Sequence, residues 1–176
     1  MEELYLVKPS AAYADQIAAY HAEFLERGDS LDGTSSLDRY SNVGDWLVWV
    51  EELSLPETCP EGFVVSTQWL CVRSADDKVV GMVNLRHDLN DHLLKIGGHI
   101  GYSTRPDERG KGYAKAMLGL CLPEAAKVEL NRVLVTCNKD NEASRRTILA
   151  HGGVLENEIW EEDEQRFVQR YWIDLK

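Results

Sequence analysis

The stretch Arg109-Gly110-Lys111-Gly112-Tyr113-Ala114 decides how this 176-residue chain is interpreted. It lies where a strand expected at about 96–104 ends and a helix expected at 112–129 begins. Glycines allow the backbone to approach a ligand closely, and the free amides and dipole at a helix start favour phosphate oxygens. The stretch therefore predicts a main-chain cradle for an anion.

Two common phosphate-binding motifs do not fit this cradle. A P-loop needs glycine where Arg105 stands, and Ser or Thr where Gly112 follows Lys111. A dinucleotide fingerprint that starts at Gly110 needs a small residue where Lys115 stands. Residue identity excludes both motifs.

The remaining pattern, Arg-x-x-Gly-x-Ala at 109–114, resembles the phosphate loop of the GNAT superfamily of N-acetyltransferases, which reads Gln/Arg-x-x-Gly-x-Gly/Ala. The preceding segment His99-Ile100-Gly101-Tyr102-Ser103-Thr104 and the later Asn141-Glu142-Ala143-Ser144 have the family's order and spacing, from about 79 to 153. The ending Arg170-Tyr171-Trp172-Ile173 is similar to a poorly characterised bacterial branch of that family. The resemblance implies one GNAT domain over 1–176, with a mixed, mostly antiparallel sheet of six to seven strands and about four helices on its two faces.

The hydrophobic periodicity independently predicts an α+β order with a β-meander first and one β-α-β crossover later. Pro123 should bend or divide the helix that contains it. The expected elements are, in chain order, a strand at 4–9, a helix from 10, a helix at 37–53, strands at 63–73, 79–87 and 96–104, a helix at 112–129, a strand at 132–137, a helix at 142–151, and strands at 154–160 and 166–174.

Charge and composition restrict the class of protein. The chain holds 19 basic and 30 acidic residues, a net charge of −11, which disfavours nucleic acid and anionic membranes as partners. Residues 105–146 are the exception, with a net charge of +3 against −14 for the remainder. The cradle lies in this basic segment, which suits a multiply phosphorylated cofactor such as acetyl-coenzyme A (acetyl-CoA).

The four cysteines form no Cys-x-x-Cys pair, and no His-rich tract lies beside them, so no metal site is expected. The N-terminal residues lack a basic segment followed by an apolar one, and no apolar run approaches the ~20 residues that span a bilayer. We therefore expect a cytoplasmic protein with packed, reduced thiols.

The resemblance also implies which residues hold acetyl-CoA. The backbone of Tyr102, Ser103 and Thr104 should meet the acyl-pantetheine arm, and polar groups of Asn138, Asn141 and Ser144 should contact the cofactor. Helix capping and turn chemistry explain the last three residues equally well. The amides that should hold the pyrophosphate are those of Arg109, Gly110, Lys111, Gly112, Tyr113 and Ala114.

Acyl transfer to an amine needs a base, a polarised carbonyl and a proton for the departing thiolate. His99 is the candidate base, with Glu51, Glu52 and His87 as alternatives, although a single His in a strand is more often structural. The family's usual tyrosine acid falls on Ile148, so Tyr171, Ser144 or water must protonate the sulfur, or the thiolate leaves unaided. Because no cysteine has a nucleophile's setting, direct attack is expected.

The acceptor is the least defined part of the sequence. Trp46 and Trp49, near Tyr40, fit either a pocket wall or the core. The acidic run 156–165 fits either attraction of a cationic amine or a solvated hairpin tip. We expect a small-molecule or peptide amine as acceptor and a monomer or homodimer. A non-catalytic acyl-CoA sensor and a protein-interaction module remain the alternatives.

Overall fold

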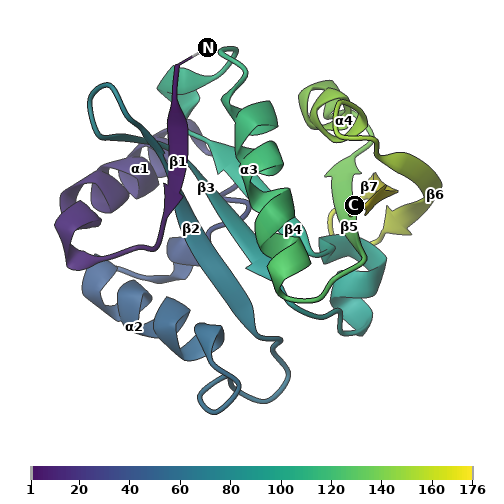
Figure 1. The fold of residues 1–176 in the computed structure, drawn as a ribbon, viewed down its shortest axis with the longest axis horizontal. Helices are drawn as coiled ribbons and strands as arrows, with labels where there is room; N and C mark the ends of the chain where they lie inside the picture. Colours follow the sequence, from purple (N-terminus) through teal and green to yellow (C-terminus); the bar gives the residue numbers. More distant parts are fainter. Residues whose placement is uncertain (1, 176) are drawn as a thin grey trace.

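The computed structural model describes residues 2–175, which form seven strands and four α-helices (Figure 1). The strands are β1 (Leu4–Val7), β2 (Ser66–Arg73), β3 (Lys78–Arg86), β4 (Ile100–Thr104), β5 (Arg132–Asn138), β6 (Val154–Glu161) and β7 (Arg166–Asp174). The helices are α1 (Ala14–Arg27), α2 (Val43–Ser54), α3 (Tyr113–Lys127) and α4 (Glu142–Leu149). These elements occur in the order that the sequence predicts.

The strands form two antiparallel sheets, one in the order β1-β2-β3-β4 and the other in the order β5-β7-β6. In the first sheet, β2 and β3 are its long central strands and are buried along most of their length. Their side chains alternate between the two faces, so each strand supplies residues to two separate cores.

Helices cover both faces of the first sheet (Figure 1). On one face, α1 packs through Ile17, Tyr20 and Phe24, which recur at helical spacing. The other face carries α3, whose Met117 and Cys121 lie in the second core with residues of β3, β5 and β7. The helix α4 joins this second core through Ile148, which is fully buried.

Local sequence signals fix the ends of these helices. Gly28 ends α1 in the left-handed conformation, with φ 67°. Asn42 caps α2, because its side-chain oxygen accepts the amide of Asp45 at 2.8 Å. Asn141 caps α4 in the same way through the amide of Ser144, at 3.1 Å.

Two expected strand boundaries and one expected helix break differ in the structure. The strand expected at 63–73 begins only at Ser66, after a turn that follows Pro60. Residues expected to open the fourth strand, Ile96 and Gly97, instead end a π-helical turn at Leu93–Gly97. Pro123 does not divide α3, because a single missing amide is tolerated within a helix that is packed into the core.

Candidate active site

The two sheets meet at a junction between β4 and β5, and from there the strands separate. The amide of His99 donates to the carbonyl of Leu134 at 2.7 Å, and the amide of Leu134 donates to His99 Nδ1 at 2.8 Å. In residues 2–175 no ladder joins the two strands beyond this point. The separation leaves an opening between the loop before α3 and the start of α4.

Two adjoining cavities occupy this opening. The larger, which we call the loop cavity, has a volume of about 750 Å³ and lies against the 109–115 loop. The smaller, which we call the inner cavity, has a volume of about 260 Å³ and is lined by residues of both sheets, among them Ile100 of β4 and Thr136 of β5. Both cavities are lined by Asp32, Tyr102, Asn141 and Ser144, so these residues mark the boundary between them.

The backbone of the loop is free to bind an anion. The amides from Arg109 to Lys115 donate to no protein acceptor within the described residues. Gly110 and Gly112 hold left-handed conformations, with φ 78° and 82°, that favour glycine. An added Cβ at Gly110 would meet only open space, so the backbone is exposed to the cavity there. The N–H groups at the start of α3 are thus unpaired, as an anion cradle requires, and their role in binding an anion stays a prediction.

The loop's basic side chains are mostly paired with the protein's own carboxylates. Lys111 Nζ lies 2.6 Å from Glu108 Oε2, and the Lys111 side chain does not line either cavity. Arg109 Nη1 lies 2.8 Å from Asp29 Oδ2, which ties the loop to the segment after α1. Lys115 lines the loop cavity and pairs with no carboxylate of residues 2–175. The local positive charge is thus weaker than a count of basic residues suggests, and any anion bound here would depend more on the backbone amides than on side-chain charge.

The strand β4 presents alternate residues to the opening. Arg105 donates its amide to Val80 of β3 at 2.8 Å, so by the two-residue period Ser103 also faces β3, whereas Tyr102 and Thr104 present their amides to the opening. Ser103 instead bonds Tyr20 Oη through its hydroxyl, at 2.9 Å. Of the three β4 residues expected to meet the cofactor arm, two therefore have the required backbone orientation.

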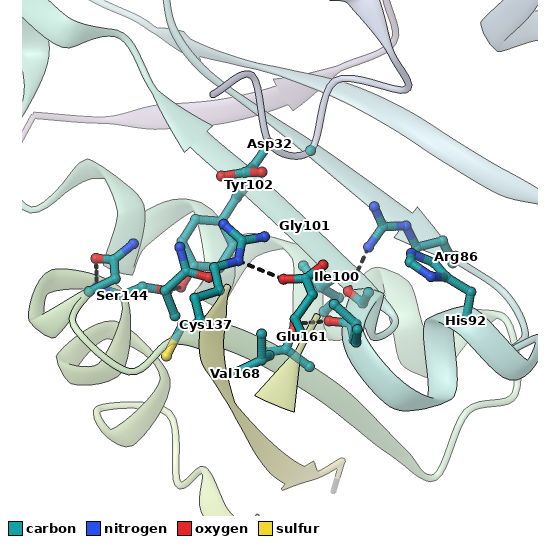
Figure 2. Close-up of a pocket in the computed structure, with 17 residues that line it drawn as sticks. Asp32, Arg86, His92, Ile100, Gly101, Tyr102, Cys137, Ser144, Glu161 and Val168 are labelled. Carbon is teal, nitrogen blue, oxygen red and sulfur yellow. Dashed lines mark hydrogen bonds and ion pairs between the residues drawn. The ribbon is translucent and has the colours of Figure 1, made fainter. Parts of the chain in front are cut away.

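Tyr102 crosses the opening and contacts α4. Its hydroxyl lies 2.7 Å from Ser144 Oγ, and Figure 2 shows this pair beside Cys137. Burial raises the pKa of Tyr102 to about 12, which keeps the phenol protonated at neutral pH. Asn141 both caps α4 and lines the two cavities, so helix capping and cofactor contact are compatible for this residue. Asn138 lines the inner cavity but not the loop cavity.

The two residues predicted to be catalytic lie apart from the cavities. His99 Nδ1 accepts the Leu134 amide, and burial lowers the pKa of His99 to about 4, so the ring is neutral and its acceptor nitrogen is engaged. Tyr171 is buried and donates to Gln169 Oε1 at 2.6 Å. Neither residue lines a cavity, nor do the alternative bases Glu51, Glu52 and His87. These settings favour structural roles.

Sequence reasoning missed most of the charged side chains of the inner cavity. Arg86 and His92 lie at one end of it in the view of Figure 2, and Ser144 lies at the other. Arg166 Nε and Glu161 Oε2 form an ion pair at 2.6 Å within the same lining. The residues come from separate segments, so only the acidic run 156–165, which includes Glu161, gave any signal in the sequence.

The aromatic residues considered as a pocket wall belong to the core instead. Trp46 is fully buried and donates its indole N–H to the carbonyl of Thr34 at 2.8 Å. Trp49 packs against the same core, and its ring contacts Phe63 edge to face. Neither tryptophan lines a cavity, so their contribution is to hold the segment that follows α1.

This fold and site define a class of protein, the acyl-CoA-dependent transferases. An anion cradle at a helix start adjoins a split between two strands, and a second cavity opens behind it. The family model "Acetyltransferase (GNAT) domain" matches residues 5–154. The chain belongs to this family; it is an acetyltransferase that uses acetyl-CoA as its donor.

Solved structures show the same fold at low sequence identity. The ribosomal-protein-S5-alanine acetyltransferase from Vibrio fischeri is 18% identical, with a TM-score of 0.75, over 100% of this chain and 95% of that one. An acetyltransferase from Salmonella typhimurium that modifies the N-terminal serine of ribosomal protein L7/L12 is 16% identical, with a TM-score of 0.69, over 98% of this chain and 95% of that one. A putative acetyltransferase from Salmonella typhimurium, solved with acetyl-CoA, is 15% identical, with a TM-score of 0.66, over 98% of this chain and 94% of that one.

No curated protein sequence matches the chain significantly. Among the helices of residues 2–175, none combines the length and the apolar character needed to cross a membrane.

Proposed function

We propose that this enzyme transfers the acetyl group of acetyl-CoA to a primary amine of a small molecule or peptide, by direct attack of the amine. The observation that carries the proposal is the run of unpaired amides from Arg109 to Lys115, which faces a cavity that adjoins a second, separate cavity. Two cavities with a shared boundary allow donor and acceptor to be bound at once. Two of the similar structures are named as acetyltransferases of ribosomal proteins, which agrees with an amine acceptor.

The residues of the loop cavity are those that would hold the donor. Amides of Gly110, Gly112 and Ala114 would bind its phosphates, and Lys115 would add a positive charge that no carboxylate of residues 2–175 neutralises. The amides of Tyr102 and Thr104 would bind the pantetheine arm and polarise the acyl carbonyl. When bound, acetyl-CoA supplies an activated acetyl thioester and a thiol leaving group.

Direct attack is favoured because the inner cavity holds no activated nucleophile of the protein. Cys137 is the cysteine that lines it, and burial raises the pKa of this thiol to about 11. At neutral pH the sulfur is therefore protonated, and a thiol is a much weaker nucleophile than a thiolate. The acceptor amine itself is the nucleophile in this mechanism.

The hydroxyl pair of Tyr102 and Ser144 is the proton source that we assign for the thiolate that departs. The pair lies on the boundary of the two cavities, where the reacting groups of donor and acceptor would meet. In such a pair one O–H is used in the internal hydrogen bond and the other is free to donate. Ile148, at the family's usual acid position, is fully buried in the core, so this pair takes over the role.

Asp32 is the carboxylate that we assign to the incoming amine. It lines both cavities, and its Oδ2 accepts the hydroxyl of Ser30 at 2.9 Å. A carboxylate at the boundary would hold the ammonium form of the acceptor next to the donor before the proton is lost.

Calorimetry with acetyl-CoA tests the donor site. Two glycines provide a matched pair, because Gly110 and Gly152 have φ values of 78° and 79° and both would place an added Cβ in open space. Only Gly110 lines the loop cavity. Gly110→Gln should weaken acetyl-CoA binding at least tenfold, which corresponds to about 1.4 kcal/mol. Gly152→Gln should lose similar stability and keep the wild-type affinity.

Enzymatic activity is tested with a thiol-release screen over amino acids, polyamines, aminoglycosides and peptides with free N-termini. Release that depends on both acetyl-CoA and an amine supports the proposal. Absence of acetyl-CoA binding would overturn it, and binding without release over the whole amine panel would favour the sensor alternative.

A further inference from the structure

Arg86 is the residue of the inner cavity whose setting points to a ligand. It ends β3, next to the junction of β4 and β5, and its own amide donates to the carbonyl of His99 at 2.7 Å. Its Nη1 donates to the carbonyls of Gly97 and Gly98, at 3.0 and 3.3 Å. These bonds hold the guanidinium in one orientation at the cavity wall.

The opposite edge of the Arg86 guanidinium has no protein partner. Within residues 2–175, Nε and Nη2 donate to no acceptor, and no carboxylate lies within 4.0 Å of the side chain. The side-chain nitrogens and oxygens that are both sealed from solvent and without a partner are His21 Nε2 and Trp69 Nε1. The free nitrogens of Arg86 therefore remain accessible, and the inner cavity that Arg86 lines gives access to them.

Two glycines make room for this arrangement. A Cβ at Gly101 would lie 3.2 Å from Arg86 Nη2 and 3.3 Å from Nη1. A Cβ at Gly33 would lie 2.3 Å from the carbonyl oxygen of Gly101. The guanidinium and the loop that carries Asp32 thus both lie close to the bare backbone of β4.

The Arg86 guanidinium forms no ion pair, although the carboxylate of Asp32 lines the same cavity. Burial lowers the pKa of Arg86 to about 10, against a smaller opposing effect of Asp32, so the side chain is still a cation at neutral pH. Arg86 is partly buried, and a partly buried charge without an ion-pair partner is unfavourable. Arg166, the other arginine that lines the cavity, differs from Arg86 because it forms an ion pair with Glu161.

We propose that the free Nε and Nη2 edge of Arg86 binds a carboxylate carried by the acceptor. The inner cavity would then accept a molecule with an ammonium group toward Asp32 and a carboxylate toward Arg86, which is the chemistry of an amino acid or short peptide. Because two carbonyls hold the planar guanidinium of Arg86 in place, its free edge is preorganised for such a bidentate contact. The inference rests on the proposed function, since it names the class of acceptor for that same site.

Paired acceptors test the inference in the wild-type enzyme. Glycine, β-alanine, γ-aminobutyrate, the L-amino acids and a set of dipeptides are each compared with their carboxamides, with acetyl-CoA as donor and thiol release as readout. At least one acid should show a kcat/KM tenfold or more above that of its amide. Equal rates for acids and amides across the panel would overturn the inference and leave the proposed function intact.

Variants of Arg86 then test whether this residue causes the preference for the acid over its carboxamide. Arg86→Met should remove the discrimination between acid and amide, mainly through KM, and Arg86→Lys should restore part of it because the charge is kept without the fork. Arg27→Met, at an exposed position of α1 outside both cavities, is the matched control and should behave as wild type. A melting curve and acetyl-CoA calorimetry on each variant show whether it is folded. An Arg86→Met variant that is folded and still prefers the acid would contradict the assignment.

The donor is the other possible source of a carboxylate. With the amide acceptors, succinyl-CoA is therefore compared with acetyl-CoA. A preference for succinyl-CoA that Arg86→Met abolishes would place the carboxylate on the acyl group and overturn the acceptor assignment. If acetyl-CoA does not bind at all, the proposed function fails instead, so the two failures are distinguishable.

Discussion

The two cavities of this enzyme are built in different ways. The loop cavity is formed by consecutive main-chain groups at the start of α3, and its basic side chains largely pair with protein carboxylates. The inner cavity owes its charged and titratable lining to side chains from the loop after α1, β3, the segment before the π-helical turn, β6 and β7, namely Asp32, Arg86, His92, Glu161 and Arg166. The first site therefore has a local signature in the sequence, and the second exists only in the folded protein.

This difference explains which function each cavity can carry. Backbone amides recognise phosphate in the same way whatever side chains surround them, so a donor shared by many enzymes suits the loop cavity. Side chains from distant segments can change independently of one another. The acceptor is thus expected to be the variable partner, and it must be inferred from this chain's own residues.

The largest expected effect lies at the boundary between the cavities. Tyr102→Phe combined with Ser144→Ala removes both hydroxyls of the proposed proton source and should lower kcat by roughly 10²- to 10⁴-fold, the usual range for general acid–base catalysis. Acetyl-CoA affinity should fall much less than kcat, because the loop amides that would bind the phosphates are unchanged, even though both side chains line the loop cavity. Steady-state kinetics and calorimetry on the same preparation measure both quantities.

Tyr171→Phe is the informative comparison for this prediction. Tyr171 is the other tyrosine considered as an acid, and its hydroxyl is bound to Gln169 away from the cavities. If Tyr171→Phe lowered kcat as strongly as the double variant, the assignment of the proton source to Tyr102 and Ser144 would be wrong.

Glu108 provides the next largest effect, on stability. Its carboxylate is 3% exposed and binds Arg73, Lys78 and Lys111. Burial alone would raise its pKa, but the hydrogen bonds from Lys111, Lys78 and Arg73 outweigh burial and lower the pKa of Glu108 to about 2. Glu108→Gln should lower the free energy of unfolding at pH 7 by about 3 kcal/mol, as measured by urea denaturation.

The pH dependence of this effect has a defined sign. A depressed pKa stabilises the folded state above the unfolded pKa of about 4.3, and the contribution is lost as the pH falls from there toward 2. The wild type and Glu108→Gln should therefore converge in stability at acid pH. A constant difference from pH 7 to pH 2 would contradict the ionic origin. Because Glu108 directly precedes the loop, this test also shows whether the main-chain site depends on its ion pairs.

Gly33 tests whether close packing of the Asp32 loop against β4 matters for acceptor binding. Gly33 and Gly28 have φ values of 68° and 67°, but a Cβ at Gly33 would lie 2.3 Å from Gly101 O, whereas one at Gly28 would meet nothing within 4 Å. Both substitutions to Ala should lose ~1–2 kcal/mol from left-handed strain. Gly33→Ala should lose a further ~1–3 kcal/mol from overpacking, and should raise the KM of the acceptor by moving the Asp32 loop. Thermal unfolding and acceptor kinetics check both results, and equal behaviour of the two variants would show that the close packing has no role.

The difference between the two cavities also explains which features of the fold and the site can be predicted from the sequence. The order of elements and the cradle follow from patterns within short segments, such as Ile17, Tyr20 and Phe24 at helical spacing and the glycines before α3. His99 carries the right chemistry for a base, yet its strand position places Nδ1 on the Leu134 amide. Arg86 gives no signal in the sequence, because its significance depends on the carbonyls of Gly97 and Gly98 and on a cavity that forms only when the sheets meet.

The smallest expected effect concerns the β6–β7 turn. Glu162, Asp163 and Glu164 are exposed at its tip and line neither cavity. Converting the three to Gln should change the acceptor KM by less than about twofold at physiological salt, because solvent-exposed charges that do not line the cavity are weakened by water and by salt screening. Glu161, in the same run, lines the inner cavity and pairs with Arg166. A large rise in KM from the tip variant that high salt reproduces in the wild type would show that long-range attraction of a cationic acceptor, and not the inner cavity alone, selects the substrate.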